Sequence, residues 1–576
     1  MIRQIGFNLA TAIAALGTSA ALAATITVNS VGDATANDGQ CTLREAITAT
    51  STNTASGASA GECAAGDPLP TVDTIAFAIA GTGVRTIQPL TVLPDILEAV
   101  VIDGYTQTGA HANTLAIGDD AILLIEIDGS LMAAGNLLRL SSSGSTIRGL
   151  VINRIQGTNI YIGSAAPGNE NHIEGNFLNT DPSGTQILGG QFAVVLVTGA
   201  QNVIGGTTPS ARNVIPASAG LGGATLMIGG DANVVQGNYI GVDASGTVPV
   251  QFDTSVFGIA LGPQGPVSNT LIGGDVPGAG NVIVANATAI SLGPGGTGTT
   301  IQGNFIGTDA TSTIGLGGSV GIATNNAPTD THIGGATAGA GNVFASLNQP
   351  IHLGDGASGV VIQGNHFGTD TSGAIPVPNH GSAIVLDTPG GNGSIIGGTN
   401  QGEGNSIAYS CGQGIAFTFG RNHWPILGNS IHSNVGLGIS LQGGSTPLPN
   451  DTGDGDDGSN DQQNYPVITA TVAAGTATIS GTLNSTPDTT FRLEFFASEI
   501  CDASGFGEGQ AYIGTTDVTT DSGGDVSFGP LSFPVPDGAE ITATATDPAG
   551  NTSEFSQCSG PHDHIFVDGF EALPCG

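Results

Sequence analysis

The chain has 576 residues, of which 94 are glycine, and its formal net charge at neutral pH is -37. All nine basic residues are arginine, against 46 acidic ones, so the chain lacks the basic face that nucleic acids and anionic membranes require. The length exceeds that of one ordinary hydrophobic core, which predicts several structural units.

Residues 1–23 have the pattern of a secretory signal peptide. Arg3 gives a short basic start, residues 13–16 lie in an apolar stretch, and Ala21-Leu22-Ala23 offers a small-x-small cleavage sequence. No later segment is apolar for long enough to cross a membrane. We therefore expect an exported protein without a transmembrane segment.

Residues 24–98 predict an N-terminal cap. Residues 25–28 alternate like a strand, and Leu43, Ala46 and Ile47 share one face of a short helix. Such a helix would cover the open edge of the first layer of a stacked β structure, which otherwise exposes unpaired backbone groups.

Residues 99–445 contain a long repeat with two recurring phrases. A Gly-Asn phrase leads to an Asp, and an Ile-Gly-Gly phrase is followed nine residues later by another Asn. The Gly-Asn phrases recur every 61 to 66 residues. This period without a helical apolar pattern predicts a β-helix, and we divide each repeat into three turns of about 21 residues, which gives about seventeen rungs. The repeated positions are Asn176, Asn238, Asn304 and Asn365, then Asp181, Asp243, Asp309 and Asp370, then Asn213, Asn281, Asn342 and Asn405.

The repeated polar residues favour structural roles. Stacked Asn side chains can bond to one another from rung to rung, and Gly accepts the positive φ of a tight corner. The repeated Asp residues are too regular and too far apart to act as a catalytic pair, so we expect them to accept hydrogen bonds at corners.

Residues 446–464 form an Asp-rich linker. Its carboxylates alternate with glycines in a way that suits Ca²⁺, although the segment does not match the EF-hand loop. A solvated acidic linker is the alternative interpretation. The candidate ligands are Asp451, Asp454, Asp456, Asp457 and Asp461.

Residues 465–560 predict a small β-sandwich of the immunoglobulin-like type, because Thr-rich and β-branched strands alternate with Gly, Pro and Asp turns. Residues 561–576 form a C-terminal tail that is too short and acidic to span a membrane. The segment 565–571 resembles a recurrent C-terminal signature of exported proteins from Gram-negative bacteria. A sorting tag and an ordinary edge strand are both open for it.

Six cysteines in an exported chain favour disulfides. We expect Cys41 to pair with Cys63 and Cys501 with Cys558. Cys411 and Cys575 are left over and their pairing stays open; a small buried apolar residue is one interpretation of Cys411, which lies inside the repeats.

The run from Cys41 to Ala46, Cys-Thr-Leu-Arg-Glu-Ala, resembles the CSLREA-type N-terminal segment of exported bacterial proteins, with Thr42 in the place of Ser. Residues 101–105 and the repeats look like the right-handed parallel β-helix that often follows this segment. The resemblance covers most of residues 25–445. It implies a right-handed parallel β-helix fold and a location outside the cell or on the bacterial outer surface, but supplies no catalytic residues.

Two places could form a carbohydrate-binding groove. One is the short stretch with Arg139, Arg148 and Arg154, and the other is Arg421 beside Trp424, whose ring could stack on a sugar. The alternatives are arginines that satisfy corner carbonyls and a tryptophan that plugs the final rungs.

The sequence therefore favours an all-β rod with an adhesive or structural role, in contact with a polysaccharide or a cell-surface partner. A carbohydrate-active enzyme, either a polysaccharide lyase or a glycoside hydrolase, is the alternative. An enzyme should break the repeat with clustered carboxylates or arginines, whereas a display protein should keep a smooth face.

Overall fold

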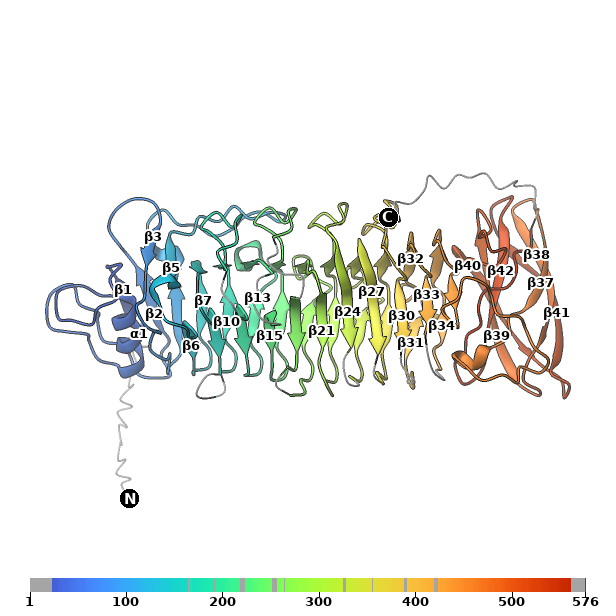
Figure 1. Ribbon diagram of the computed structural model, residues 1–576, viewed down its shortest axis with the longest axis horizontal. Coiled ribbons are helices and arrows are strands. Elements are labelled where there is room, and N and C mark those ends of the chain that lie inside the picture. The colour runs from blue at the N-terminus through green and yellow to red at the C-terminus, as the bar shows by residue number, and fades with distance from the viewer. Residues whose placement is uncertain are drawn as a thin grey trace, which may run out of the picture.

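Figure 1 shows the computed structural model, an elongated rod of stacked strands with an antiparallel unit at one end. The structure describes residues 23–560 and Cys575, except residues 164, 165, 167, 190, 191, 218–222, 251–255, 264, 325–327, 355, 388–390 and 419–422. Nearly all of the predicted signal peptide and of the predicted tail lie outside the described residues. Within the described part of the chain, no helix is long and apolar enough to cross a membrane.

Three long parallel sheets form the rod, and the chain visits them in turn. Sheet 1 consists of β1 (Thr25–Val28), β2 (Asp73–Phe77), β4 (Val100–Asp103), β7 (Thr146–Arg148), β10 (His172–Glu174), β13 (Val203–Gly205), β16 (Val234–Gln236), β19 (Leu271–Gly273), β22 (Thr300–Gln302), β25 (His332–Gly334), β28 (Val361–Gln363), β31 (Ile395–Gly397) and β34 (Ile426–Leu427).

Sheet 2 consists of β3 (Arg85–Ile87), β5 (Ile125–Asp128), β8 (Leu150–Asn153), β11 (Phe177–Leu178), β14 (Val214–Ile215), β17 (Tyr239–Ile240), β20 (Val282–Ile283), β23 (Phe305–Ile306), β26 (Val343–Phe344), β29 (His366–Phe367), β32 (Ser406–Ala408) and β35 (Ser430–His432).

Sheet 3 consists of β6 (Leu138–Leu140), β9 (Ile160–Ile162), β12 (Val195–Val197), β15 (Ala224–Ile228), β18 (Phe257–Leu261), β21 (Thr288–Leu292), β24 (Gly318–Thr324), β27 (Leu347–Gly354), β30 (Ile384–Asp387), β33 (Ile415–Phe417) and β36 (Ile439–Ser440). The parallel β-helix prediction is confirmed.

The core of the rod is a stack of aliphatic side chains that point inward from the middle of each short strand. Ile173, Ile204, Val235 and Ile272 are in register on sheet 1 and are fully buried. Because each rung packs only on its neighbours, the core can extend along the whole rod without thickening.

A continuous ladder of buried asparagines runs along the corner between sheets 1 and 2. Each side-chain amide donates to Oδ1 of the next Asn at 2.8–3.2 Å. The ladder therefore pairs polar groups that would otherwise be buried without partners. Its members are Asn176, Asn213, Asn238, Asn281, Asn304, Asn342, Asn365, Asn405 and Asn429.

The ladder corrects the predicted number of rungs. The Gly-Asn and Ile-Gly-Gly phrases lie on alternate rungs, and each places an Asn at the same corner. Successive ladder residues are 37–43 and 23–25 residues apart in alternation, so each repeat holds two rungs and not three. The sheets have 11 to 13 strands instead of seventeen. At ~4.8 Å per strand the rod is about 60 Å long.

The longer rung of each repeat carries a loop between sheets 2 and 3, and the repeated Asp organises it. Oδ1 of Asp309 accepts the backbone N–H groups of Thr313 and Ile314, both at 3.0 Å. Asp181 and Asp370 each accept N–H groups at the same two offsets. The expected structural role of these aspartates is confirmed.

Helix α1 (Leu43–Thr52) closes the N-terminal end of the rod. Thr42 caps it in a capping box with Glu45, and Leu43, Ala46 and Ile47 are buried in the core of the rod. Arg44 pairs with Asp33 at 2.9 Å. The residues of the Cys-Thr-Leu-Arg-Glu-Ala run thus hold the cap in place.

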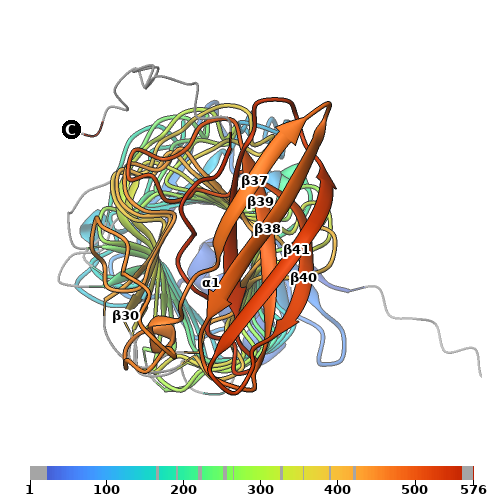
Figure 2. The same cartoon turned by 90° about the vertical axis from the view of Figure 1, so that its right-hand side faces the viewer.

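The C-terminal unit consists of two three-stranded antiparallel sheets with a shared apolar core, which confirms the predicted sandwich. One sheet is β37 (Val467–Ala473), β38 (Thr476–Asn484) and β41 (Asp525–Pro534), and the other is β40 (Ala511–Thr519), β39 (Thr490–Ser498) and β42 (Glu540–Thr546). Figure 2 shows these strands lying across the end of the rod.

Three disulfides cross-link the chain. Cys41 pairs with Cys63 and Cys501 with Cys558, as the sequence analysis expected. The third joins Cys411 to Cys575, 164 residues apart. This pairing, which the sequence left open, excludes the interpretation of Cys411 as a free apolar residue, because its sulfur is bonded to Cys575.

Candidate functional site

The outer face of sheet 1 carries two regular rows of side chains, which we call the sheet 1 stripe. The first row is mostly aliphatic, in register from strand to strand: Val203, Val234, Leu271, Thr300, His332, Val361 and Ile395. All of its members are half-buried except His332, which is exposed. The second row alternates glycine and glutamine: Gly205, Gln236, Gly273, Gln302, Gly334, Gln363 and Gly397.

The glutamines fasten the second row to the sheet. Nε2 of Gln236, Gln302 and Gln363 donates to the carbonyl of the glycine on the next strand at 2.8, 3.0 and 2.9 Å. The stripe spans seven strands, or about 30 Å at the strand spacing of a sheet. It holds no Asp, Glu, Lys or Arg, although the chain has a net charge of -37.

The stripe contains none of the repeated asparagines. The repeated asparagines lie in the buried ladder, where each is at most 3% exposed. The outward positions belong instead to aliphatic residues, threonine and glutamine.

Toward the N-terminus the glycine–glutamine row is replaced by charged residues. Asp103, Arg148 and Glu174 occupy the equivalent positions on β4, β7 and β10. Nη2 of Arg148 lies 2.7 Å from Asp103 and Nη1 lies 3.8 Å from Glu174. The hydrogen bond to Asp103 raises the pKa of the Arg148 guanidinium. The alternation of glycine and glutamine is absent from these three strands, and Arg148 is the one of these three residues that the sequence predicted as a site residue.

The other two arginines of the predicted groove lie on different faces. Arg139 is on β6 of sheet 3 and pairs with Asp95 at 2.6 Å. Arg154 follows β8 of sheet 2 and pairs with Asp128 at 3.0 Å. Arg139, Arg148 and Arg154 therefore do not form one groove, because the short strands turn the chain to a new sheet between them.

The second predicted carbohydrate site does not present its aromatic residue. Trp424 is fully buried in the core of the rod, so its ring has no face for a sugar, and the expectation is corrected. Its backbone N–H donates to Oδ1 of Asn460 at 2.9 Å. Trp424 thus plugs the final rungs, and Arg421 lies outside the described residues.

Three of the five predicted calcium ligands converge. Asp451, Asp454 and Asp456 each place a carboxylate oxygen within 4.8 Å of the other two. Burial, together with the charges of the two other carboxylates, raises the pKa of Asp454 to about 6. Asp457 and Asp461 are not in this group, and Asp461 accepts a hydrogen bond from Asn551. Three hard oxygen donors fit Ca²⁺, which would relieve the mutual repulsion of the carboxylates.

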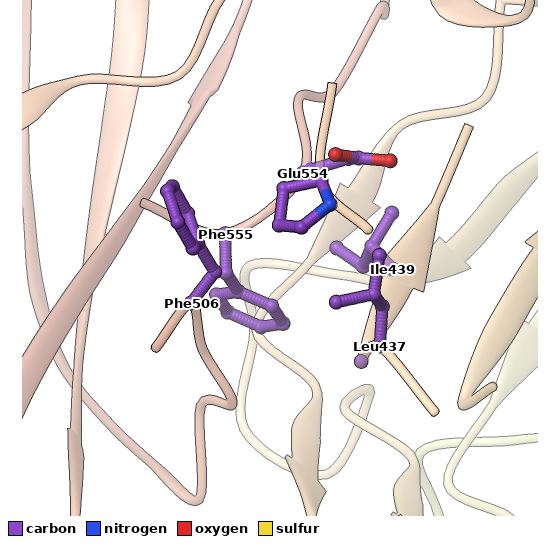
Figure 3. A pocket seen from close by; sticks show the side chains of 7 residues that line it. Leu437, Ile439, Phe506, Glu554 and Phe555 are labelled. Atoms are coloured by element: carbon purple, nitrogen blue, oxygen red, sulfur yellow. The ribbon is translucent and has the colours of Figure 1, made fainter. Parts of the chain in front are cut away.

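Two hollows in the described chain lie away from these charged groups. One, of about 390 Å³, is lined by hydroxyl-rich residues around α1, among them Thr48 and Thr52. The other is filled by side chains and lies between the last rung and the sandwich, where Phe506, Phe555 and Glu554 face Leu437 and Ile439 (Figure 3).

Comparison with protein-family models finds no match, and comparison with curated proteins finds none. Among solved structures, the chain is similar to a double mutant of the tailspike protein of E. coli bacteriophage HK620, with 10% identity over 82% of this chain and 80% of that one and a TM-score of 0.29. A single mutant of the same tailspike in complex with a pentasaccharide has 12% identity over 82% and 86% of the two chains and a TM-score of 0.19. The fold assignment rests on the sheets described above.

Proposed function

We propose that this chain is an exported rod whose sheet 1 stripe contacts a glycan or a cell-surface partner in an adhesive or structural role. The observation that carries the proposal is the stripe itself, two in-register rows about 30 Å long without a carboxylate, lysine or arginine. An uncharged partner can cover such a surface without stripping water from ions, a step that is costly when the ions stay unpaired.

The chemistry of the stripe supports a sugar polymer as the partner. Aliphatic side chains pack against the C–H faces of sugar rings, and the glutamine amides keep an oxygen and a second N–H for hydroxyl groups. The repetition along the rod provides many equivalent weak contacts, which add up in multivalent binding.

Two features that are consistent with export support this role. Three disulfides suit an oxidising compartment, and the Cys-Thr-Leu-Arg-Glu-Ala segment resembles that of exported bacterial proteins. The protein would act outside the cell or on the bacterial outer surface.

The charged row keeps a carbohydrate-active enzyme as a second candidate. Asp103 and Glu174 both contact the guanidinium of Arg148, at 2.7 Å and 3.8 Å, so this group and not the strand spacing sets the separation of their carboxylates. A gap the width of one guanidinium falls within the ~5 to 9.5 Å that separates the two carboxyl groups of glycoside hydrolases. Arg148 lies between them and is bonded to Asp103, so a substrate would have to displace this contact.

We also propose a Ca²⁺ site at Asp451, Asp454 and Asp456, in the linker between rod and sandwich. Asp451 and Asp454 both hydrogen-bond to Asn464 just before β37, so an ion held here would stiffen this connection.

A polysaccharide panel separates the two candidate functions. The mature protein is incubated with neutral and acidic polysaccharides, and both retention on the polymer and new reducing ends are measured. The proposed role predicts retention by a neutral polymer without new reducing ends. Cleavage that disappears in Asp103→Asn or Glu174→Gln would make the protein an enzyme and contradict the proposal.

A further inference from the structure

The last rung of the rod ends in strands that have no further parallel neighbour. Strands β34, β35 and β36 are the terminal strands of sheets 1, 2 and 3. A terminal strand leaves a row of backbone N–H and C=O groups that can pair with another chain. The first rung at the N-terminal end also has strands without a further neighbour, and α1 covers that end.

Three buried glutamates of the C-terminal unit take the place of the next rung. Glu494 lies on β39, Glu508 precedes β40 and Glu554 follows β42. Their side chains are 0%, 5% and 3% exposed. Each of them hydrogen-bonds to the last rung, and Glu494 also pairs with Arg492 of its own strand at 2.9 Å.

Each carboxylate accepts hydrogen bonds from this end of the rod. Oε2 of Glu494 accepts the N–H of Gly428 at 2.9 Å. Glu508 accepts the backbone N–H of Asn434 at 3.1 Å and its side-chain amide at 2.8 Å. Oε1 of Glu554 accepts the N–H of Leu441 at 2.9 Å. The donors follow one another around the rung, one after each of the three sheets.

Apolar packing seals the same joint. Phe496 and Phe555 belong to the core of the rod although they come from the sandwich, and their rings meet edge to face at 5.4 Å. Figure 3 shows Phe506 and Phe555 on one side of the pocket at this joint and Leu437 and Ile439 on the other. The two phenylalanines are at most 4% exposed, and hydrogen bonds to carboxylates are stronger in such a low-dielectric environment.

We propose that the C-terminal unit is the closing cap of the rod, and that Glu494, Glu508 and Glu554 keep the last rung from pairing with a second copy of this chain. The occupant of an uncovered end is a second copy because identical strand edges are complementary when two rods meet end to end about a two-fold axis. Since α1 covers the other end, association stops at a dimer and no filament forms.

The test uses the full mature chain with Glu494→Ala, Glu508→Ala and Glu554→Ala combined. Light scattering coupled to gel filtration gives the mass, and circular dichroism reports the β structure. We expect the parent protein to be a monomer and the triple variant a dimer with unchanged β content. Glu499→Ala, which removes an exposed carboxylate of the same unit, should stay monomeric.

A milder variant keeps the test decisive if the triple variant does not fold. In Glu554→Gln, hydrogen exchange at residues 437–448 should be about tenfold faster than in the parent, while residues 300–306 stay unchanged. Dimer should then grow with protein concentration. A monomer at every concentration, or exchange equal to that of the parent, would overturn the proposal.

Discussion

The side-chain amide of Asn213 donates to Oδ1 of Asn238 at 2.9 Å, although the two residues are 25 positions apart. Asn213 belongs to the Ile-Gly-Gly phrase and Asn238 to the Gly-Asn phrase. The bond therefore shows why both phrases recur: they reach the same corner, the Asn of the Ile-Gly-Gly phrase after a long rung and the Asn of the Gly-Asn phrase after a short rung. Register between rungs is fixed at this corner.

Removal of one ladder residue should destabilise the rod strongly. Asn281 is fully buried, donates to Asn304 and accepts from Asn238. In Asn281→Ala both neighbours lose a buried partner, and we expect unfolding free energy to fall by about 3 kcal/mol. Denaturant unfolding measures this loss. Asn348→Ala, at an exposed position, serves as the control and should change it by less than about 0.5 kcal/mol.

The loop aspartates should matter for stability and not for binding. Asp309 is fully buried and accepts two backbone N–H groups and the hydroxyl of Thr311. We expect Asp309→Ala to cost about 2 kcal/mol, because hydrogen bonds to a charged group are lost. Retention on a polysaccharide should equal that of the parent. Loss of retention in a folded Asp309→Ala protein would show that the loops contribute to contact.

The joint between rod and sandwich should be more stable in acid. Burial raises the pKa of Glu508 to about 8, against hydrogen bonds from Asn434 that lower it, and the nearby charge of Asp502 also raises it. Burial likewise raises the pKa values of Glu494 and Glu554. The folded state therefore binds these protons more tightly than the unfolded state.

The stability of the joint should therefore fall as the pH rises. The stabilisation by Glu508 is fully present below its unfolded pKa of 4.5 and is lost as pH rises through about 8. The midpoint temperature of thermal unfolding should fall as the pH is raised between these two values. In Glu508→Gln, which cannot ionise, the slope should be smaller. A midpoint that rises with pH over this range would contradict the assignment.

Calcium should stabilise the linker through three of its aspartates. A site filled at 100 times its dissociation constant adds about 2.7 kcal/mol to the stability of the part that it holds. We expect Ca²⁺ to raise the unfolding midpoint of the parent and to have no effect on Asp454→Asn. Asp457→Asn, outside the converging group, should still respond. An equal response in all three proteins would assign the effect to general screening.

Much of the fold follows from the sequence because its signals are local. The short β-branched runs, the Gly-Asn corners and the capping residues Thr42 and Glu45 each form contacts with residues nearby or one rung away. The predicted number of rungs was wrong because the length of the loops, and not that of the strands, sets the period of the repeat. Each repeat contains two Asn phrases, and these correspond to its two rungs.

Less of the candidate site than of the fold could be predicted from the sequence. Whether Arg148 and Arg154 share a face depends on which residue begins each turn, and no local pattern fixes that. Glu494, Glu508 and Glu554 resemble ordinary surface glutamates in the sequence. Their role appears only when residues more than 60 positions away are placed against them. The same holds for Cys411 and Cys575.

The claim that the sheet 1 stripe is the contact surface is tested most directly by placing a charge on the stripe and measuring binding. Leu271→Glu places a carboxylate in the middle of the sheet 1 stripe, and Ile314→Glu makes the same change on an exposed loop side chain. Retention is measured on the neutral polysaccharide that holds the parent most strongly. We predict that Leu271→Glu lowers retention at least about tenfold, equivalent to 1.4 kcal/mol, and that Ile314→Glu does not. Equal retention by both folded variants and the parent would contradict the claim that the stripe is the contact surface.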